Sequence, residues 1–541
     1  MQLTTTFRTV ATLPHTELTA APPIPAGRMQ ARRWSPQRWS TVLTALSFAT
    51  LLIHGYHPLA EDGGLYVAGV EWKLKPSLFP RFTEFVSEHL RFSAFAPLVA
   101  TLTRFTHLPL LTVLLVLNLV SIALTLAAAR ALLRRVTEND HAQLAGVGML
   151  AAMWTVPIAG TSLLLMDPYV TARSLSTPLS LWAVALALDD WKQKPRALLG
   201  CLIAITLAAA FHPLMAGYAL GLILVLRGLR SQRKALVLGT LAVLTISAAA
   251  ILQARAPAES AAVVLAAKSR YYWFLSQWHW YELFGLAGPL LVLAVLMWWN
   301  RPGLRERGSD LALACILYGC FAAGLTLVFG QESYHAHIIA RLQPLRGFLI
   351  IYAVMFLLLG ASVQQHLEQM AARSPALRPI RLVVPALLLV SAGAMFLSQR
   401  REFPASAHIE LPWRMGESPN PWVRAFLWCR DNTPRGALFA LDAHYITTPG
   451  EDAQTFRAIA LRSAVPDFSK DGGEAAITPR LAGEWLAGFT AQLNLDRQTA
   501  PQLRAGLAPF GVDWLILRSS SPAVLECPYN DGALKVCRLQ P

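Results

Sequence analysis

The sequence predicts a polytopic α-helical membrane protein with a small C-terminal α/β domain outside the membrane. Of the 541 residues, 54% are hydrophobic and only 15% are charged, and the mean hydropathy is +0.42, whereas about a quarter of the residues of a soluble domain are charged. Apolar runs of about 18 or more residues, long enough to cross a bilayer, recur along the chain. From residue 398 onward the composition returns to that of a soluble domain.

The N-terminal segment, residues 1–39, carries five arginines among many Pro, Thr and Ala residues. This composition predicts a disordered basic tail. The apolar run that follows lacks a small-residue cleavage site, so we expect it to remain as the first helix and not to be removed as a signal peptide.

We predict eleven membrane spans in a transmembrane domain over residues 40–397. Their ranges are 40–56, 109–130, 142–164, 174–188, 196–211, 213–227, 234–253, 282–299, 310–330, 346–363 and 380–397. The fourth, fifth and sixth are short, and His212-Pro213 divides the fifth from the sixth. These three could be broken or re-entrant helices, which a bilayer tolerates only where protein buries their backbone.

The distribution of Arg and Lys predicts the orientation of the chain in the membrane. These residues account for the net charge of +15, and they collect in alternate loops, all on one side of the predicted spans. That side is expected to be cytoplasmic, together with the N-terminus. Zinc-finger spacing and basic-aromatic strands are lacking, which argues against nucleic acid as a partner. An odd number of spans puts the C-terminal segment on the extracytoplasmic side.

The C-terminal segment, residues 398–541, predicts an α/β domain. Residues 436–444 and 512–519 have the pattern of short buried strands, and residues 421–432 and 483–493 that of helices. The stretch 448–473 mixes charges and glycines, and we expect a solvated loop there, with binding of a sugar or a partner as the alternative.

The end of the chain predicts a β-hairpin. Asn530-Asp531-Gly532 is a strong turn signal between two short strands. Cys527 and Cys537 flank this turn and could face one another across it. An oxidising compartment would permit a disulfide between them; two free thiols are the alternative.

The first extracytoplasmic loop, residues 57–108, opens with HPLAEDGGLYVAGVEW. After the acidic Glu61 and Asp62, the sequence predicts an amphipathic helix lying along the membrane, with Tyr66 and Trp72 as interface anchors. This helix would hold the two carboxylates over the bundle, and the following two glycines would allow a sharp turn where a ligand approaches. The alternative is that the two carboxylates are simply interfacial.

Other loops on the same side contribute groups of complementary charge. They are Asp167 and Arg173, His212, Lys268 and Arg270, His335 and His337, and Arg341 and Arg346. Each basic residue alone could anchor lipid headgroups. Together with a carboxylate pair, they are the groups needed to bind a phosphate at headgroup level and to activate a hydroxyl beside it.

Several motif classes are lacking. Neither GxxxxGK[ST] nor GxGxxG occurs, which disfavours nucleotide-driven chemistry. A GxSxG elbow is also lacking. The pair His335-x-His337 is a weak metal signal, because alternate residues point to different sides of a strand or helix, and no Cys/His spacing indicates a zinc site.

The order of the loops, with AEDGGLY, DPYVTARS, FHP and RLQPLRG, resembles bacterial members of the C superfamily of integral-membrane glycosyltransferases. The resemblance implies a polyprenyl-phosphate-sugar donor, with Asp62 as general base and Glu61 assisting. Phosphate or substrate binding is expected from a set of residues in the other loops, namely Arg346, His212, Arg173, Asp167, Lys268, Arg270 and His337. The acidic pair is Glu-Asp and not the DxD of that superfamily, so no cofactor is assigned from the resemblance, and a divalent cation stays possible.

The resemblance also implies a location in the bacterial inner membrane, with the C-terminal domain periplasmic or extracellular. Membrane lipids are expected partners, and the acceptor could be a glycan, a lipid or a protein. The main alternative is a non-catalytic scaffold or sensor with a ligand-binding C-terminal domain. A transporter or flippase fits less well, because the polar groups collect at one face and the halves of the chain do not match. A polymerase or ligase of surface polysaccharide would share the donor and differ only in the acceptor.

Overall fold

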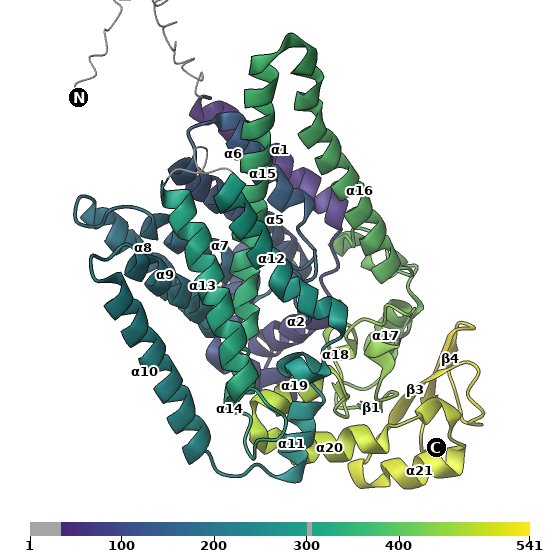
Figure 1. The fold of residues 1–541 in the computed structure, drawn as a ribbon. Helices are drawn as coiled ribbons and strands as arrows, with labels where there is room; N and C mark the ends of the chain where they lie inside the picture. The colour runs from purple at the N-terminus through teal and green to yellow at the C-terminus, as the bar shows by residue number, and fades with distance from the viewer. Residues whose placement is uncertain (1–33, 300–305, 449, 541) are drawn as a thin grey trace, which may run out of the picture.

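The computed structural model describes residues 34–299, 306–448 and 450–540. It is mostly helical, with a bundle of long helices and a small sheet near the C-terminus (Figure 1). Most of the predicted basic tail lies outside the described residues. Helix α1 (Pro36–His54) takes up the last residues of that tail, with Pro36 in its first turn and Ser35 as the N-cap, whose hydroxyl accepts from the Arg38 N–H.

Each of the eleven predicted spans contains a helix. After α1 these are α5 (Leu110–Val136), α6 (Asp140–Ala152), α7 (Ala172–Ala187), α8 (Pro195–Phe211), α9 (Pro213–Leu229), α10 (Lys234–Arg255), α12 (Trp280–Trp299), α13 (Glu306–Phe329), α15 (Phe348–Arg373) and α16 (Val383–Glu402). Six stretches of the described chain are long and apolar enough to cross a membrane, and they contain α5, α10, α12, α13, α15 and α16. Helices α8 and α9 are apolar but shorter.

Burial separates the bundle core from its periphery. Most of α15 is buried, whereas α10 and α16 have few buried residues despite their apolar composition. Exposed apolar helices of this kind are typical of a surface that faces lipid. Between α8 and α9, His212 serves as the N-cap of α9 and Pro213 occupies its first turn. The missing N–H and fixed φ of proline suit that position and account for the break between the two helices.

The third predicted span is wrong in its second half. Helix α6 ends at Ala152, and residues 153–171 form an irregular segment that turns back on itself through a bridge between Pro157 and Leu164. The N–H of Ile158 bonds to the carbonyl of Leu163, and that of Leu165 to the carbonyl of Val156. The segment is apolar because protein surrounds it, and hydropathy alone does not separate this case from a membrane helix.

The loop 57–108 folds into α2 (Glu61–Leu74), α3 (Glu84–Ser87) and α4 (Phe95–Thr106). The helix predicted after the acidic pair is therefore present. Helix α2 packs between α4 and the short helix α18 (Phe456–Ala460) near the C-terminus, and Figure 1 shows it between the bundle and the C-terminal elements. Tyr66, expected as an interface anchor, instead packs edge-on against His89 and Phe95.

We refer to residues 403–540 as the C-terminal domain, since α16 continues to Glu402. Its five-stranded sheet has the order β2-β1-β3-β5-β4, and the strands are β1 (Leu438–Ala440), β2 (Ser463–Ala464), β3 (Trp514–Arg518), β4 (Tyr529–Asn530) and β5 (Leu534–Arg538). Strand β1 is parallel to β2 and β3, and β5 is antiparallel to β3 and β4. Besides α18, the helices are α17 (Pro421–Asn432), α19 (Lys470–Ile477), α20 (Ala482–Ala491) and α21 (Ala500–Leu507).

The elements of the C-terminal domain lie where the sequence predicts them. Both predicted strands and both predicted helices are present, as β1, β3, α17 and α20. The hairpin turn between β4 and β5 contains Gly532 at φ 88°, a conformation that favours glycine. Cys527 and Cys537 form a disulfide, which ties the start of the hairpin to strand β5.

Candidate active site

The segment that leads from α1 to the acidic pair is held at fixed points. Tyr56 forms a parallel bridge with Ile409 of the C-terminal domain, and the His57 N–H bonds to the carbonyl of Pro168 at 2.8 Å. Two residues before the acidic pair, the carbonyl of Leu59 accepts from the Thr455 N–H at 3.1 Å. The acidic pair is thus positioned by contacts from the irregular segment 153–171 and from the C-terminal domain.

Glu61 and Asp62 form the first turn of α2. Glu61 has a φ of 48°, which is uncommon for a residue other than glycine and is often found at functional sites. The hydroxyl of Thr455 donates to the Glu61 carbonyl at 3.2 Å. The acidic side chains are about half exposed, at 46% and 57%. The two side chains therefore face open space, while Thr455 contacts the backbone of this turn.

The two glycines after the acidic pair are helical, which corrects the prediction of a sharp turn. A Cβ at Gly63 would lie 3.0 Å from the Tyr169 ring, and a Cβ at Gly64 would lie 2.3 Å from the Thr455 hydroxyl oxygen. The glycines are needed because other parts of the protein approach the backbone closely. They allow α2 to dock against both Tyr169 and the C-terminal domain.

Lys470 is the residue of the site that sequence reasoning missed. Its ammonium lies 3.0 Å from the Asp62 Oδ1 and also bonds to the Glu61 Oε2. This ammonium is the largest influence that lowers the pKa of Asp62; burial opposes the shift, and Arg346 and Arg173 lower the pKa further. Asp62 is therefore ionised at neutral pH, ready to accept a proton or a hydrogen bond.

Asp167 and Arg173 lie close to this acidic pair and form an ion pair with each other. Arg173 also donates to the carbonyl of Leu164 at 2.7 Å. Burial raises the pKa of Asp167, Arg173 lowers it, and the charge of Asp62 raises it. Because its charge is shared with Asp167, Arg173 contributes less positive potential to the site than a free guanidinium would.

Arg346 is the least neutralised cation near Asp62. It belongs to a 3₁₀ turn, Pro344–Gly347, at the entry to α15. Within the described part of the chain its guanidinium has no carboxylate partner, and its buried Nε has no hydrogen-bond partner. The guanidinium carbon lies 5.0 Å from the centroid of the Tyr272 ring. A guanidinium held in this way can still bind an incoming anion.

His212 lies within the field of the same cations. Burial lowers its pKa most, the charges of Arg173 and Arg346 act in the same direction, and the resulting pKa is about 4. Its Nδ1 accepts from the Met215 N–H at 3.4 Å as the cap of α9, so Nε2 is the ring nitrogen that carries the proton. A neutral imidazole can offer this N–H to an anion without adding charge.

Two of the predicted site residues, Arg270 and His337, have other partners, and a third, Lys268, is exposed. Arg270 donates to the carbonyls of Ser469 and Phe468, at 2.7 and 3.0 Å, just before Lys470. His337 bonds through Nδ1 to Glu259 at 2.7 Å. Lys268 is exposed at the end of α11 (Ala261–Lys268). Arg270 therefore supports the segment that carries Lys470, and His337 is held by Glu259.

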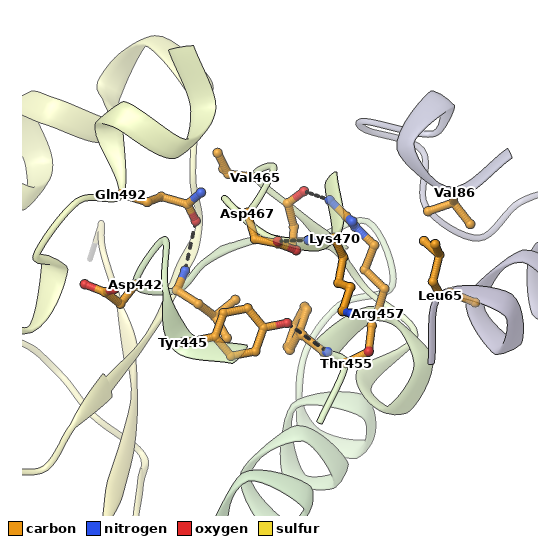
Figure 2. A pocket seen from close by; sticks show the side chains of 14 residues that line it. Leu65, Val86, Asp442, Tyr445, Thr455, Arg457, Val465, Asp467, Lys470 and Gln492 are labelled. Atoms are coloured by element: carbon orange, nitrogen blue, oxygen red, sulfur yellow. Dashed lines mark hydrogen bonds between the residues drawn. The ribbon is translucent and has the colours of Figure 1, made fainter. Parts of the chain in front are cut away.

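The stretch 448–473 is not a solvated loop, which corrects a prediction. Many of its polar side chains are buried, namely Asp452, Gln454, Thr455, Arg457, Asp467 and Asp471. Figure 2 shows Arg457, Asp467 and Lys470 of this stretch lining a cavity together with Leu65 of α2 and Val86 of α3. One signal in the sequence could have indicated that this stretch is buried, namely the number of charged residues that stand beside apolar ones. Charged side chains that are buried need partners, and this stretch contains several.

Metal ligands do not cluster in the described residues: no three His, Cys, Asp or Glu side chains are grouped closely enough to hold a metal ion. At the acidic pair, the position between the two carboxylates is taken by the Lys470 ammonium.

No protein-family model and no curated protein matches the chain. Among solved structures, it is similar to the archaeal oligosaccharyltransferase AglB from Archaeoglobus fulgidus, in complex with an inhibitory peptide and a dolichol-phosphate, over 90% of this chain and 70% of that one (13% identity, TM-score 0.44). An Archaeoglobus fulgidus oligosaccharyltransferase in the apo form matches over 89% and 70% (12% identity, TM-score 0.49).

The arabinofuranosyltransferase AftD from Mycobacteria matches over 94% of this chain and 40% of its own (13% identity, TM-score 0.45). These neighbours are described as oligosaccharyltransferases and an arabinofuranosyltransferase. At this identity and these TM-scores they are distant likenesses of the fold. The function proposed next is argued from the residues of this chain.

Proposed function

We propose that this protein is a membrane glycosyltransferase that moves a sugar from a polyprenyl-phosphate carrier to an acceptor hydroxyl at the extracytoplasmic face. The observation that carries the proposal is the pairing of opposite charges near Asp62. An ionised, half-exposed carboxylate lies within the influence of Arg346, which has no carboxylate partner among the described residues. A base and a free anion site close together are what such a transfer requires.

The phosphate of the donor would bind to Arg346. The neutral imidazole of His212 would donate a hydrogen bond to it, and Arg173 would add positive potential although Asp167 partly neutralises it. Lys268 and His337 are left out of this proposal, because Lys268 is exposed at the end of α11 and His337 bonds to Glu259. The apolar exposed surface of the bundle supplies an environment for the polyprenyl chain.

The reaction would be a direct displacement. The acceptor hydroxyl oxygen bonds to the anomeric carbon while the bond from that carbon to the phosphate oxygen breaks. The hydroxyl proton moves to the carboxylate of Asp62, and the electron pair of the broken bond stays on the departing polyprenyl phosphate. Negative charge grows on the phosphate in the transition state, so preorganised cations such as Arg346 lower the barrier. Glu61, bonded to Lys470, would orient the acidic turn.

Native mass spectrometry of the detergent-purified protein, with added undecaprenyl phosphate as the probe, tests the proposal. The wild type and Asp62→Asn are expected to retain one lipid per chain, and Arg346→Ala is expected to lose it. Arg255→Ala is the matched control, because Arg255 is exposed at the end of α10 and its guanidinium has no hydrogen bond or ion pair with the described residues. Absence of lipid from the wild type, or equal retention by Arg346→Ala, would overturn the proposal and favour a non-catalytic scaffold.

A further inference from the structure

Lys470 has an unusual position relative to the acidic pair. Its side chain is only 13% exposed, whereas those of Glu61 and Asp62 are 46% and 57% exposed. The ammonium therefore approaches the two carboxylates from the protein side. The other carboxylate oxygens, Glu61 Oε1 and Asp62 Oδ2, accept no hydrogen bond from the described residues, so they remain available on the open side.

The backbone of Lys470 is fixed by contacts that do not involve the acidic pair. Its N–H donates to the Asp467 Oδ1 at 2.6 Å, and Arg270 holds the two carbonyls just before it. The next residue, Asp471, forms a double hydrogen bond with Arg457, at 2.7 and 3.0 Å, with both side chains buried. Figure 2 shows Lys470 beside Asp467 and Arg457 at the cavity wall. The C-terminal domain thus presents the ammonium to the acidic pair from a prearranged segment.

Two adjacent carboxylates that face the same space repel one another unless a cation lies between them. Divalent ions with oxygen ligands commonly have this role. Here the Lys470 ammonium lies between the two carboxylates. It supplies one positive charge and up to three N–H donors. The acidic pair with Lys470 keeps one net negative charge, which leaves a carboxylate able to accept a proton.

We propose that Lys470 is the resident cation of the acidic pair, a positioning residue that the C-terminal domain delivers to Glu61 and Asp62 in the place where a divalent metal ion would otherwise bind. The role of the acidic pair in catalysis rests on the proposed function, whereas the exchange of ammonium for metal does not. Removing the ammonium should leave two carboxylates with a vacant position between them. Such a position can bind a divalent ion, while the wild-type site cannot.

Binding of Mn²⁺ to the full-length purified protein, measured by electron paramagnetic resonance of the free ion, tests this inference. We expect Lys470→Ala, and Lys470→Met, which keeps most of the apolar stem, to bind Mn²⁺ at least tenfold more tightly than the wild type. The gain should disappear in Lys470→Ala combined with Asp62→Asn. Lys470→Arg should behave like the wild type, because the guanidinium restores the positive charge.

Lys73→Ala is the matched control, because Lys73 is an exposed lysine on the same helix and its ammonium has no partner among the described residues. It should gain no Mn²⁺ affinity, which separates a local effect from a general change in surface charge. A general destabilisation would not produce a site that depends on Asp62. Two outcomes would overturn the inference: Mn²⁺ binding by the wild type that Asp62→Asn abolishes, or no gain in either folded Lys470 variant.

The experiment uses no lipid and no sugar, so its result is independent of the proposed transfer. If undecaprenyl phosphate fails to bind but Lys470→Ala acquires Mn²⁺, the resident cation stands and the proposed function falls. If the lipid binds as expected but neither variant acquires Mn²⁺, the proposed function stands and the inference about Lys470 is wrong.

Discussion

The Lys470 Nζ lies 3.0 Å from the Asp62 Oδ1, although 408 positions separate the two residues in the chain. Asp62 comes from the first loop after α1, and Lys470 comes from the C-terminal domain. Their contact means that the candidate site is complete only when this domain is docked on α2. The hydrogen bonds from Thr455 to Leu59 and Glu61 hold the same junction, so changes at the junction should alter the acidic pair.

We expect Asp62→Asn to reduce the release of polyprenyl phosphate from a lipid-linked donor by roughly 10²–10⁴-fold, because an amide cannot accept the acceptor proton. Glu61→Gln should lose less, since Glu61 is expected to orient and not to take the proton. Release can be followed by liquid chromatography and mass spectrometry of the lipid, with thermal unfolding as the check on folding. A larger loss in Glu61→Gln than in Asp62→Asn would assign the base to Glu61.

The ion pair between Arg457 and Asp471 is buried on both sides and makes two hydrogen bonds. Replacing one partner leaves an uncompensated buried charge, which costs roughly 3–5 kcal/mol. We therefore expect Arg457→Met to lower the thermal unfolding temperature markedly. Arg430→Ala is the control, because its ion pair with Asp431 is exposed and should contribute at most about 1 kcal/mol. Similar shifts in both variants would contradict the argument.

Glu474 and His89 approach to 3.4 Å, but burial opposes charge on both. Burial raises the pKa of Glu474 to about 8, with the carboxylates of Asp471, Asp62 and Glu88 acting in the same direction. Burial also lowers the pKa of His89 to about 4, although Asp62 raises it. Near pH 7 we therefore regard the contact as a pair of neutral groups. An uncharged Glu474 adds no further negative charge beside Asp62.

This arrangement predicts how stability depends on pH. The folded protein holds the Glu474 proton up to about pH 8, whereas an unfolded glutamate loses it near pH 4.3. The contribution of Glu474 to the free energy of unfolding is therefore complete below about pH 4 and is lost as the pH rises to 8. The lowered pKa of His89 has the opposite effect: it makes the folded protein less stable as the pH falls. This effect begins only below about pH 6.5, the usual pKa of histidine. Between pH 6.5 and 8 the unfolding temperature should fall less steeply in Glu474→Gln than in the wild type. Equal slopes would contradict the assignment.

Elements with a strong local pattern could be predicted from the sequence. The helices in the apolar runs, helix α17 and the Gly532 turn follow from hydropathy, capping and turn chemistry. The irregular segment after Ala152 could not be predicted, because burial in protein and burial in lipid select the same apolar residues. Lys470 could not be assigned to the acidic pair, because a charged residue carries no local sign of a partner so far away in the sequence.

The close packing of α2 against the C-terminal domain leads to a last prediction, at Gly64. In most helices, replacing glycine by alanine is favourable by roughly 0.5–1 kcal/mol. At Gly64 the new Cβ would lie 2.3 Å from the Cβ and hydroxyl oxygen of Thr455 and 2.7 Å from the carbonyl of Leu59, so the neighbouring atoms must shift, and we expect α2 and the C-terminal domain to separate. Gly64→Ala should therefore lower the unfolding temperature, and Glu61 and Asp62 should move away from Lys470.

Gly483→Ala is the matched control for this prediction. Gly483 lies in the first turn of α20, is exposed, and has no atom within 4 Å of an added Cβ. That variant should be at least as stable as the wild type. Hydrogen exchange of the α2 amides should increase in Gly64→Ala and stay unchanged in Gly483→Ala. A Gly64→Ala protein with unchanged exchange would mean that Thr455 can move aside, and that the junction is looser than these distances require.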